Sequence, residues 1–285
     1  MIDLLRKRLA SYAITDARQE EQALKEILQE LALYSLWRAG FFEVAAFQGG
    51  TCLRILHGLP RFSEDLDFIL LKADDTFEWQ PYFATLIEVL AEFGVDAQLN
   101  DRGKMDRAVR QAMLKDDSIG RQLELAFYSD NISRKLKVKL EIDTNPPQGS
   151  GFDYRYHDFP LDFELCIQDL PSNFALKIHA ILCHPYLKGR DWYDFAWYCR
   201  QHIAPNLPHL SAALNQIGPW AGEGVEVDMA WLEAALIEKI RSINWQQAAK
   251  DVEPFLPTPE QASLKLWSER FFTTKVNTLN PTPAS

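Results

Sequence analysis

Two aspartates separated by a single leucine, Asp65 and Asp67, are the residues of this sequence best suited to metal chemistry. An apolar run at residues 68–71 follows them. Side chains two residues apart on a β-strand leave the same face, so the pattern predicts that both carboxylates converge while Leu66 turns away. Mg²⁺ prefers one or two carboxylates completed by water and substrate phosphate. The pair is therefore a candidate magnesium site, although an isolated Asp-x-Asp is more often the solvated end of a strand.

A glycine turn upstream favours the metal interpretation. Gly49 and Gly50 follow a short apolar strand expected at residues 44–47 and precede Thr51 at the expected start of a helix. Glycine tolerates a positive φ and lets a ligand approach the backbone closely. Successive N–H groups, together with a capping Thr51 hydroxyl, form a concavity suited to phosphate. Such a turn alone is usually a plain connection, but one helix before paired aspartates it predicts a phosphate cradle beside metal ligands.

A third carboxylate is expected on a later strand. Residues 135–142 alternate apolar and charged side chains, which predicts a strand with Glu141 and Asp143 on its polar face. If this strand neighbours the one that follows Asp65, either acid points towards the aspartate pair. A centre with two Mg²⁺ ions needs this further ligand, because two aspartates are too few to hold both ions. The alternative is a charged strand edge that faces solvent.

These residues resemble the first motif of the nucleotidyltransferase superfamily: a Gly-Thr pair, a spacer of residues 52–64 and the Asp-Leu-Asp triplet. The longer string GGTCLRILHGLPRFSEDLDF, which places Arg61 and Ser63 before the aspartates, is similar to the AbiEii/AbiGii toxin branch, which includes the MenT toxins. The resemblance covers residues 40–200. It implies that Glu141 is the third metal ligand, with Asp143 as the alternate, because the family's acid follows a Lys-hydrophobic pair.

A second string, SNFALKIHAILCHPYLKGRDWYDFAW, resembles the family's later motifs, in which a helical lysine and an aspartate after a Lys-Gly-Arg turn complete the site. Lys177 would contact the β- or γ-phosphate as a point charge. Asp191 would lie at a helix start, where the dipole favours a carboxylate, and a simple N-cap is its alternative role. The expected catalytic residues are thus Asp65, Asp67, Glu141, Lys177 and Asp191, and the expected nucleotide-binding residues are Gly49, Gly50, Thr51, Arg61, Ser63, Lys177 and Arg190.

Hydrophobic periodicity and turn signals predict the elements that position these residues. Helices are expected at residues 17–39, 76–94, 105–114, 174–183, 207–217, 228–240 and 259–272, and further strands at residues 95–99, 121–128 and 161–170. Ser172 or Asn173 is the expected N-cap of the helix that carries Lys177. The break at residues 145–151 is the expected domain boundary. The predicted fold class is α+β: a nucleotidyltransferase-like mixed sheet flanked by helices in residues 1–150, and a mainly helical domain in residues 151–285 that contributes Lys177 and Asp191 to the cleft.

Composition limits the partners. The formal net charge of −10 argues against a protein covered in nucleic-acid contacts. Residues 102–139 nevertheless hold ten Lys or Arg against five Asp or Glu, which suits either a local RNA contact or a solvent-facing surface. The four cysteines have no Cys-x-x-Cys spacing and are expected to be free thiols. No stretch is apolar enough to span a bilayer, so we expect a cytoplasmic protein without membrane contact.

Taken with the resemblance, these observations predict a Mg²⁺-dependent nucleotidyltransferase toxin of a type IV toxin–antitoxin system, with a cognate antitoxin as a possible partner. It would transfer a nucleotidyl group from a nucleoside triphosphate to RNA, with the tRNA acceptor end favoured. Adenylylation of a protein hydroxyl is one alternative, because the same centre suits either acceptor. A nucleotide-binding module without turnover, and an interaction protein whose acidic surface meets a basic partner, are the others.

Overall fold

The computed structural model describes residues 1–104, 108–123, 125 and 136–279. The chain forms two compact units. Unit 1 comprises Met1–Gly58, Phe62–Pro146 and Asp153–Ile167, and unit 2 comprises Leu59–Arg61, Pro147–Phe152 and Gln168–Ser285. The chain passes from unit 1 to unit 2 after Pro146, close to the boundary expected at residue 150. Two further segments also change unit: residues 59–61 belong to unit 2, and residues 153–167 belong to unit 1.

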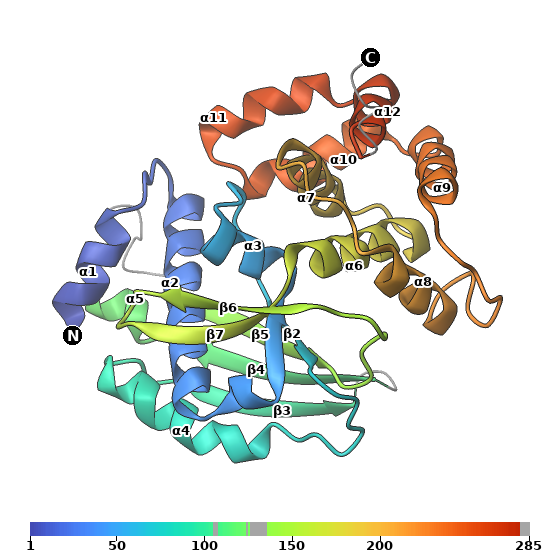
Figure 1. The fold of residues 1–285 in the computed structure, drawn as a ribbon. Coiled ribbons are helices and arrows are strands. Elements are labelled where there is room, and N and C mark those ends of the chain that lie inside the picture. The colour runs from blue at the N-terminus through green and yellow to red at the C-terminus, as the bar shows by residue number, and fades with distance from the viewer. Residues whose placement is uncertain (105–107, 124, 126–135, 280–285) are drawn as a thin grey trace. The chain divides into compact units, whose positions relative to one another are not determined.

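Unit 1 is built on a seven-stranded mixed sheet (Figure 1). Its strands are β1 (Ala45–Gln48), β2 (Leu66–Leu70), β3 (Gln98–Lys104), β4 (Val109–Asp116), β5 (Leu136–Asp143), β6 (Phe152–His157) and β7 (Phe163–Gln168). Their order across the sheet is β3-β4-β5-β2-β1-β7-β6. β2 runs antiparallel to β1 and parallel to β5, so the strand that follows Asp65 and the strand that carries Glu141 are neighbours.

The sequences of β2 and β5 explain their central positions. In β5 the apolar residues Leu136, Val138, Leu140 and Ile142 are all buried, whereas the charged residues between them are at least partly exposed. This alternation is typical of a strand with one face in the core. In β2 the run from Phe68 to Leu70 is buried at every position, as expected for a strand covered on both faces.

The helices of unit 1 are α1 (Ile2–Ala10), α2 (Ala17–Arg38), η1 (Phe41–Glu43), α3 (Gly49–His57), α4 (Gln80–Glu92) and α5 (Ile119–Gln122). The long helix α2 begins at Asp16, whose side chain accepts hydrogen bonds from two backbone N–H groups of the first turn. α2 packs against α4, and these helices contact β5 and β3 respectively, so they cover one face of the sheet (Figure 1). α3 contacts β1 and β2, and this places the Gly-Gly turn beside Asp67.

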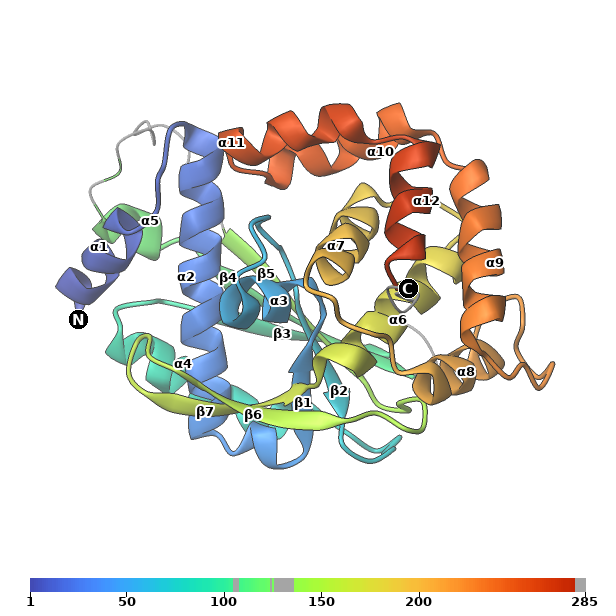
Figure 2. The same cartoon turned by 45° about the horizontal axis from the view of Figure 1, so that its top comes forward.

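Unit 2 consists largely of helices (Figure 2). They are α6 (Leu170–Cys183), α7 (Gly189–Arg200), α8 (Leu207–Gln216), α9 (Met229–Arg241), α10 (Trp245–Val252), η2 (Glu253–Phe255), α11 (Thr258–Gln261), η3 (Ala262–Leu266) and α12 (Glu269–Asn277). α6 packs against α7 and α8, α7 against α10, and α9 against α12. Trp245 stacks on Phe272 with 4.2 Å between ring centroids, and Trp192 of α7 meets both rings edge-on. The aromatic residues of α7 are all buried and form core: Trp192, Tyr193, Phe195, Trp197 and Tyr198.

Several sequence expectations about elements were wrong or fall partly outside the described residues, and one of them is the single helix expected at residues 259–272, which is divided into α11, η3 and α12. The helix expected at residues 105–114 is a strand from Val109 onward, because pairing with β3 and β5 overrides its weak helical pattern. Of the strand expected at residues 121–128, the first two residues end α5, and residues 124 and 126–128 lie outside the described part. The N-cap of α6 is Asp169, whose side chain accepts the Ser172 N–H at 2.8 Å.

Two expectations about membrane and sulfur chemistry can be compared with the structure. None of the helices in the described ranges combines the length and apolar content needed to cross a lipid bilayer. All four cysteines are free thiols, and Cys52, Cys166 and Cys199 are buried. The prediction of unpaired cysteines is therefore confirmed.

Candidate active site

The acidic residues of β2 and β5 lie on one face of the sheet in unit 1. The parallel register places Asp67 opposite Glu141, and Leu66 opposite Leu140. Directly opposed residues on neighbouring strands point to the same side, with Cβ atoms roughly 5 Å apart. Asp143 lies opposite Ile69, two residues further along the same face, and accepts the Asn145 N–H at 2.9 Å. The register thus brings Glu141, rather than Asp143, next to Asp67.

A lysine lies among these carboxylates. The Lys139 Nζ is 2.8 Å from Glu141 Oε2 and 3.3 Å from Asp65 Oδ2. The other Glu141 oxygen accepts a short hydrogen bond from the Gln111 side chain of β4. Burial raises the pKa of Asp65. The charge of Lys139 acts in the opposite direction, and the negative charge of Glu141 adds to the rise. Burial lowers the pKa of Lys139, but its two acidic partners outweigh this and raise it overall, so the lysine remains a cation.

The Asp67 carboxylate lies against the glycine turn and leaves no room for a side chain at Gly49. Gly49, the first residue of α3, has φ +76°, and a Cβ built on it would lie 2.6 Å from Asp67 Oδ2. Only glycine fits there, because a side chain would be strained by the backbone and would also collide with the carboxylate. Thr51 is buried, and its hydroxyl donates a short hydrogen bond to the backbone carbonyl of Asp65. No side-chain hydrogen bond caps α3, so the expectation that Thr51 caps this helix was wrong.

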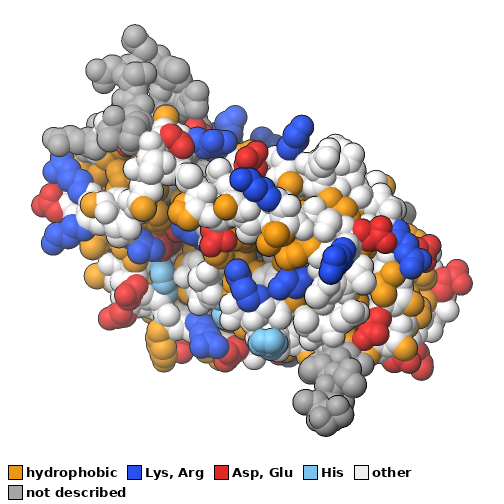
Figure 3. Space-filling model, turned by 90° about the horizontal axis from the view of Figure 1, so that it is seen from above, with side chains coloured by type: hydrophobic (Ala, Val, Ile, Leu, Met, Phe, Trp, Pro, Cys, Tyr) orange, Lys and Arg blue, Asp and Glu red, His pale blue; other side chains and the backbone are white. Residues whose placement is uncertain are grey.

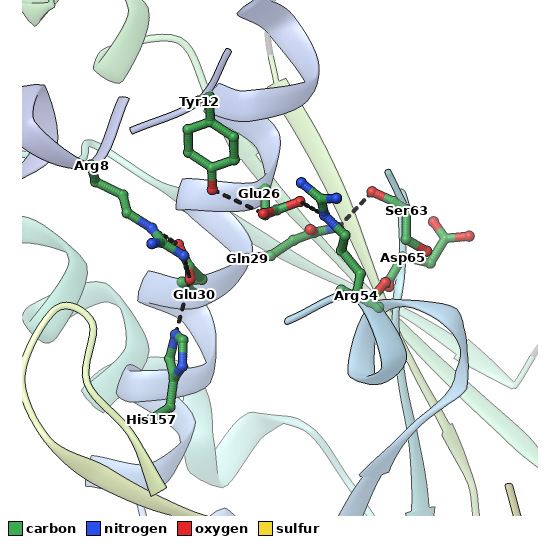
Figure 4. A network of polar contacts seen from close by, with 10 residues as sticks. Arg8, Tyr12, Glu26, Gln29, Glu30, Arg54, Ser63, Asp65 and His157 are labelled. Carbon is green, nitrogen blue, oxygen red and sulfur yellow. Dashed lines mark hydrogen bonds and ion pairs between the residues drawn. The ribbon is translucent and has the colours of Figure 1, made fainter. Parts of the chain in front are cut away.

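A polar network on α2 holds the segment that precedes β2 (Figure 4). The Gln29 side chain donates to the backbone carbonyl of Ser63 at 3.3 Å, and Arg54 of α3 donates to Glu26 at 2.7 Å. Tyr12 donates to the same glutamate at 3.0 Å. The Gln29 contact joins α2 to the segment that leads into β2, so it helps to fix the position from which Asp65 projects. Sequence reasoning missed it, although the polar residues within the apolar pattern of α2 were its signal.

One turn further along α2, Glu30 is fully buried and forms a second part of the same network (Figure 4). Both of its oxygens accept from the Arg8 guanidinium of α1, and His157 of β6 lies 2.9 Å from Oε1. A buried carboxylate without partners is costly, so Glu30 ties α1 and β6 to the middle of α2.

Unit 2 contains a buried cluster of four charged residues. Arg61 binds Asp194 through two hydrogen bonds of 2.6 Å, and the exposed fractions of these side chains are 2% and 0%. Lys177 lies 3.0 Å from both Asp191 and Asp194 and is 14% exposed. Two cations thus balance two anions. Arg190, the neighbour of Asp191, places its guanidinium 4.4 Å from the centre of the Phe255 ring.

The charges of this cluster support one another. Burial lowers the pKa of Lys177, but Asp191 and Asp194 more than compensate and raise it above its usual value. Burial raises the pKa of Asp191, yet Lys177, Lys188 and Arg61 outweigh burial and lower it overall. Lys177 is therefore a permanent cation whose position is set by two carboxylates.

The sequence-predicted site residues thus fall into two sets. Unit 1 brings together the acids Asp65, Asp67 and Glu141 with the Gly49 turn, and unit 2 brings together Lys177 and Asp191. Sequence reasoning missed two partners of these sets. Lys139 shares the polar face of its strand with Glu141, so the alternation of residues 135–142 was a usable signal. The pairing of Arg61 with Asp194, which are 133 residues apart, had no local signal.

Comparison with known proteins decides the family. The family model described as nucleotidyl transferase AbiEii toxin, type IV TA system, matches residues 31–271. The chain belongs to this AbiEii family. It is therefore a nucleotidyltransferase of the type IV toxin–antitoxin class, and the resemblance seen in its two motif strings is confirmed. A search of curated proteins gives no match.

Two solved structures are similar to this AbiEii protein. MenT4, a nucleotidyltransferase toxin from Mycobacterium tuberculosis H37Rv, is 15% identical, with a TM-score of 0.59 over 100% of this chain and 91% of that chain. JHP933 from Helicobacter pylori is 15% identical, with a TM-score of 0.49 over 91% of this chain and 89% of that chain. The likeness to MenT4 confirms the predicted class, a nucleotidyltransferase-like mixed sheet with flanking helices.

Nucleotidyl transfer generally uses divalent metal ions. The carboxylates that could hold such an ion in this AbiEii protein are Asp65, Asp67 and Glu141. Within the described ranges, no three His, Cys, Asp or Glu side chains form a ready-made metal site. The donor set nevertheless fits a hard cation. Asp65 and Glu141 already share one positive charge, the Lys139 ammonium group, and Asp67 lies in register with Glu141.

Proposed function

We propose that this AbiEii protein transfers a nucleotidyl group from a nucleoside triphosphate to an RNA hydroxyl in a Mg²⁺-dependent reaction, with the tRNA acceptor end as the first target to test. The observation that carries the proposal is the register of β2 and β5, which sets Asp67 opposite Glu141 beside the Gly49 turn. Hard oxygen donors next to a turn that admits no side chain suit a metal-bound triphosphate.

Asp65, Asp67 and Glu141 would hold the metal, with Asp143 as the alternate third ligand. A bound Mg²⁺ supplies neutralisation of the phosphate charge and assists ionisation of the attacking hydroxyl. The register favours Glu141, because Asp143 lies two residues further along β5, opposite Ile69. The chain's own contribution is to hold these carboxylates in place, through the Gln111 contact to Glu141 and the Thr51 contact to the Asp65 backbone.

In unit 1, backbone N–H groups of the Gly49-Gly50 turn would bind phosphate. In unit 2, the Lys177 ammonium group is a separate candidate phosphate ligand. Lys177 suits this task because its charge is maintained and its position is fixed by Asp191 and Asp194. Arg61 supports it indirectly, since Arg61 is buried and engages Asp194 through both hydrogen bonds described above. Direct nucleotide contacts by Thr51, Arg61, Ser63 and Arg190 remain predictions.

The partners follow from the family and from charge. A cognate antitoxin is implied by membership of a toxin–antitoxin family, and we propose that the protein works in the cytoplasm, where tRNA is found. Acidic and basic side chains are interspersed over the face drawn in Figure 3. An RNA acceptor would therefore be recognised by a limited group of basic residues, and its binding would have a modest salt dependence.

The experiment is labelling with each of the four α-³²P nucleoside triphosphates in the presence of Mg²⁺, with a tRNA pool or with cell protein as acceptor. Label in tRNA supports the proposal, and label confined to protein would replace it with protein adenylylation. Asp67→Asn is expected to abolish labelling without loss of folding. Asp162→Asn, an exposed aspartate of the same unit, is the matched control and should retain activity. Full activity in Asp67→Asn would refute the assigned metal site.

A further inference from the structure

The Lys139 side chain lies where a metal ion would have to bind. Its ammonium group contacts one oxygen of Asp65, which directly precedes β2, and one oxygen of Glu141, two residues along β5. The side chains of Lys139, Asp65 and Glu141 are 30%, 35% and 24% exposed, so all three are open to solvent and to ions. Mg²⁺ binds carboxylate oxygens at about 2.1 Å. An ammonium group held between the same oxygens therefore excludes the ion sterically and by charge.

We propose that Lys139 is a built-in competitor of the divalent cation: its ammonium group neutralises Asp65 and Glu141 in the metal-free protein and has to move away before the metal ion can bind. This inference rests on the proposed function, because it takes Asp65, Asp67 and Glu141 to be the metal ligands. It assigns to Lys139 control of metal affinity, and with it control of the metal concentration at which the toxin becomes active.

Charge balance explains why a cation is needed there. Asp65, Asp67 and Glu141 project from one face, and carboxylates this close repel one another unless a cation lies between them. Lys139 reduces the local charge from −3 to −2. Lysine suits a temporary role because its charge is carried on a flexible stem of four carbons and can swing away from the sheet. A planar guanidinium would hold both carboxylates more firmly.

Glu141 is the carboxylate whose position is held by a second contact. Its second oxygen accepts from Gln111, whose side chain is 7% exposed and comes from the neighbouring strand β4. Gln111 therefore holds the Glu141 carboxylate in place whichever cation it binds. Exchange of the ammonium group for a metal ion then requires movement of the Lys139 stem and a turn of Asp65, while the β-strands stay in place.

The test is titration of the full-length protein with Mn²⁺, a Mg²⁺ substitute whose free form is counted directly by electron paramagnetic resonance. Lys139→Met is expected to bind Mn²⁺ about tenfold more tightly than the unmodified protein, because the ion no longer displaces a charge. Lys137→Met is the matched control. This lysine lies on the same strand and the same face, opposite Lys115, and its replacement should change the affinity by less than about twofold.

A second measurement covers the case in which Lys139→Met folds poorly. Reductive ¹³C-methylation of the unmodified protein gives a resonance for each lysine, and Lys139→Arg identifies that of Lys139. Addition of Mg²⁺ should shift this resonance, and Asp67→Asn should abolish the shift. Equal or weaker Mn²⁺ binding by Lys139→Met, or a Lys139 resonance that Mg²⁺ leaves unchanged while Mn²⁺ still binds through Asp67, would overturn the competition alone. Absence of Mn²⁺ binding in every variant would overturn the metal site as well.

Discussion

Replacing Arg61 with methionine removes a guanidinium that is 2% exposed and bound to Asp194 by two hydrogen bonds of 2.6 Å. Methionine keeps most of the volume, so the change chiefly removes the charge. Asp194 and Asp191 then share the single cation Lys177 in a buried position. Breaking a buried ion pair in this way costs about 3–5 kcal/mol. With a urea dependence of about 2 kcal/mol per M, the unfolding midpoint of unit 2 should fall by roughly 2 M.

Urea denaturation followed by tryptophan fluorescence measures this, since Trp192 is buried in unit 2 and its ring packs edge-on against the partly buried Trp245. Arg200→Met, an exposed arginine at the end of α7, is the matched control and should change stability by less than about 0.5 kcal/mol. The double variant Arg61→Met with Asp194→Leu should be more stable than Arg61→Met alone, because it removes the unpaired carboxylate. A loss of less than about 1 kcal/mol in Arg61→Met would refute the reasoning.

Three further predictions concern unit 1. Gly49→Ala should abolish nucleotidyl transfer, because its Cβ would lie 2.6 Å from Asp67 Oδ2; Gly58→Ala, at φ +71° with open space around it, should retain transfer and lose only about 1 kcal/mol of stability. Thr51→Val should lower stability by about 1 kcal/mol through loss of the hydrogen bond to the Asp65 carbonyl, whereas Thr51→Ser should not, as thermal melting would reveal. Burial lowers the pKa of His57 to about 4, and the charge of Arg155 adds to this decrease. The imidazole is therefore protonated near pH 6.5 in the unfolded chain but only near pH 4 in the folded protein. This contribution to stability is complete above pH 6.5 and is lost as the pH falls towards 4; the stability difference between pH 7 and pH 5 should be about 1–2 kcal/mol smaller in His57→Gln, and an unchanged difference would contradict the assignment.

The acidic face of the sheet was predictable because its cause is local. The period of two along residues 65–67 and 135–142 fixes which side chains share a face, whatever the rest of the chain does. Adjacency of the two strands was a hypothesis at the sequence level, and the register of Asp67 with Glu141 bears it out. The direct contact between Lys177 and Asp191 follows from two segments that the family resemblance already linked.

The remaining features depend on contacts that sequence spacing does not encode. Residues 109–114 read as a helix because their apolar positions suit either period, and only the pairing of β4 with β5 decides the matter. Thr51 has the type and position of a helix cap, yet its hydroxyl finds the Asp65 carbonyl, which is brought near by the return of the chain into β2. Arg61 is four residues from Asp65 but belongs with Asp194, in the other unit.

The assignment of Arg61 to unit 2 limits how the toxin can be divided into fragments. Among the described residues before 147, the tripeptide at residues 59–61 alone is assigned to unit 2. A fragment that starts near residue 150 would look complete by length and by helix content, yet it would carry Asp194 without its guanidinium. Such a fragment should therefore be less stable than unit 2 in the full-length protein, because Asp194 would lack its buried partner.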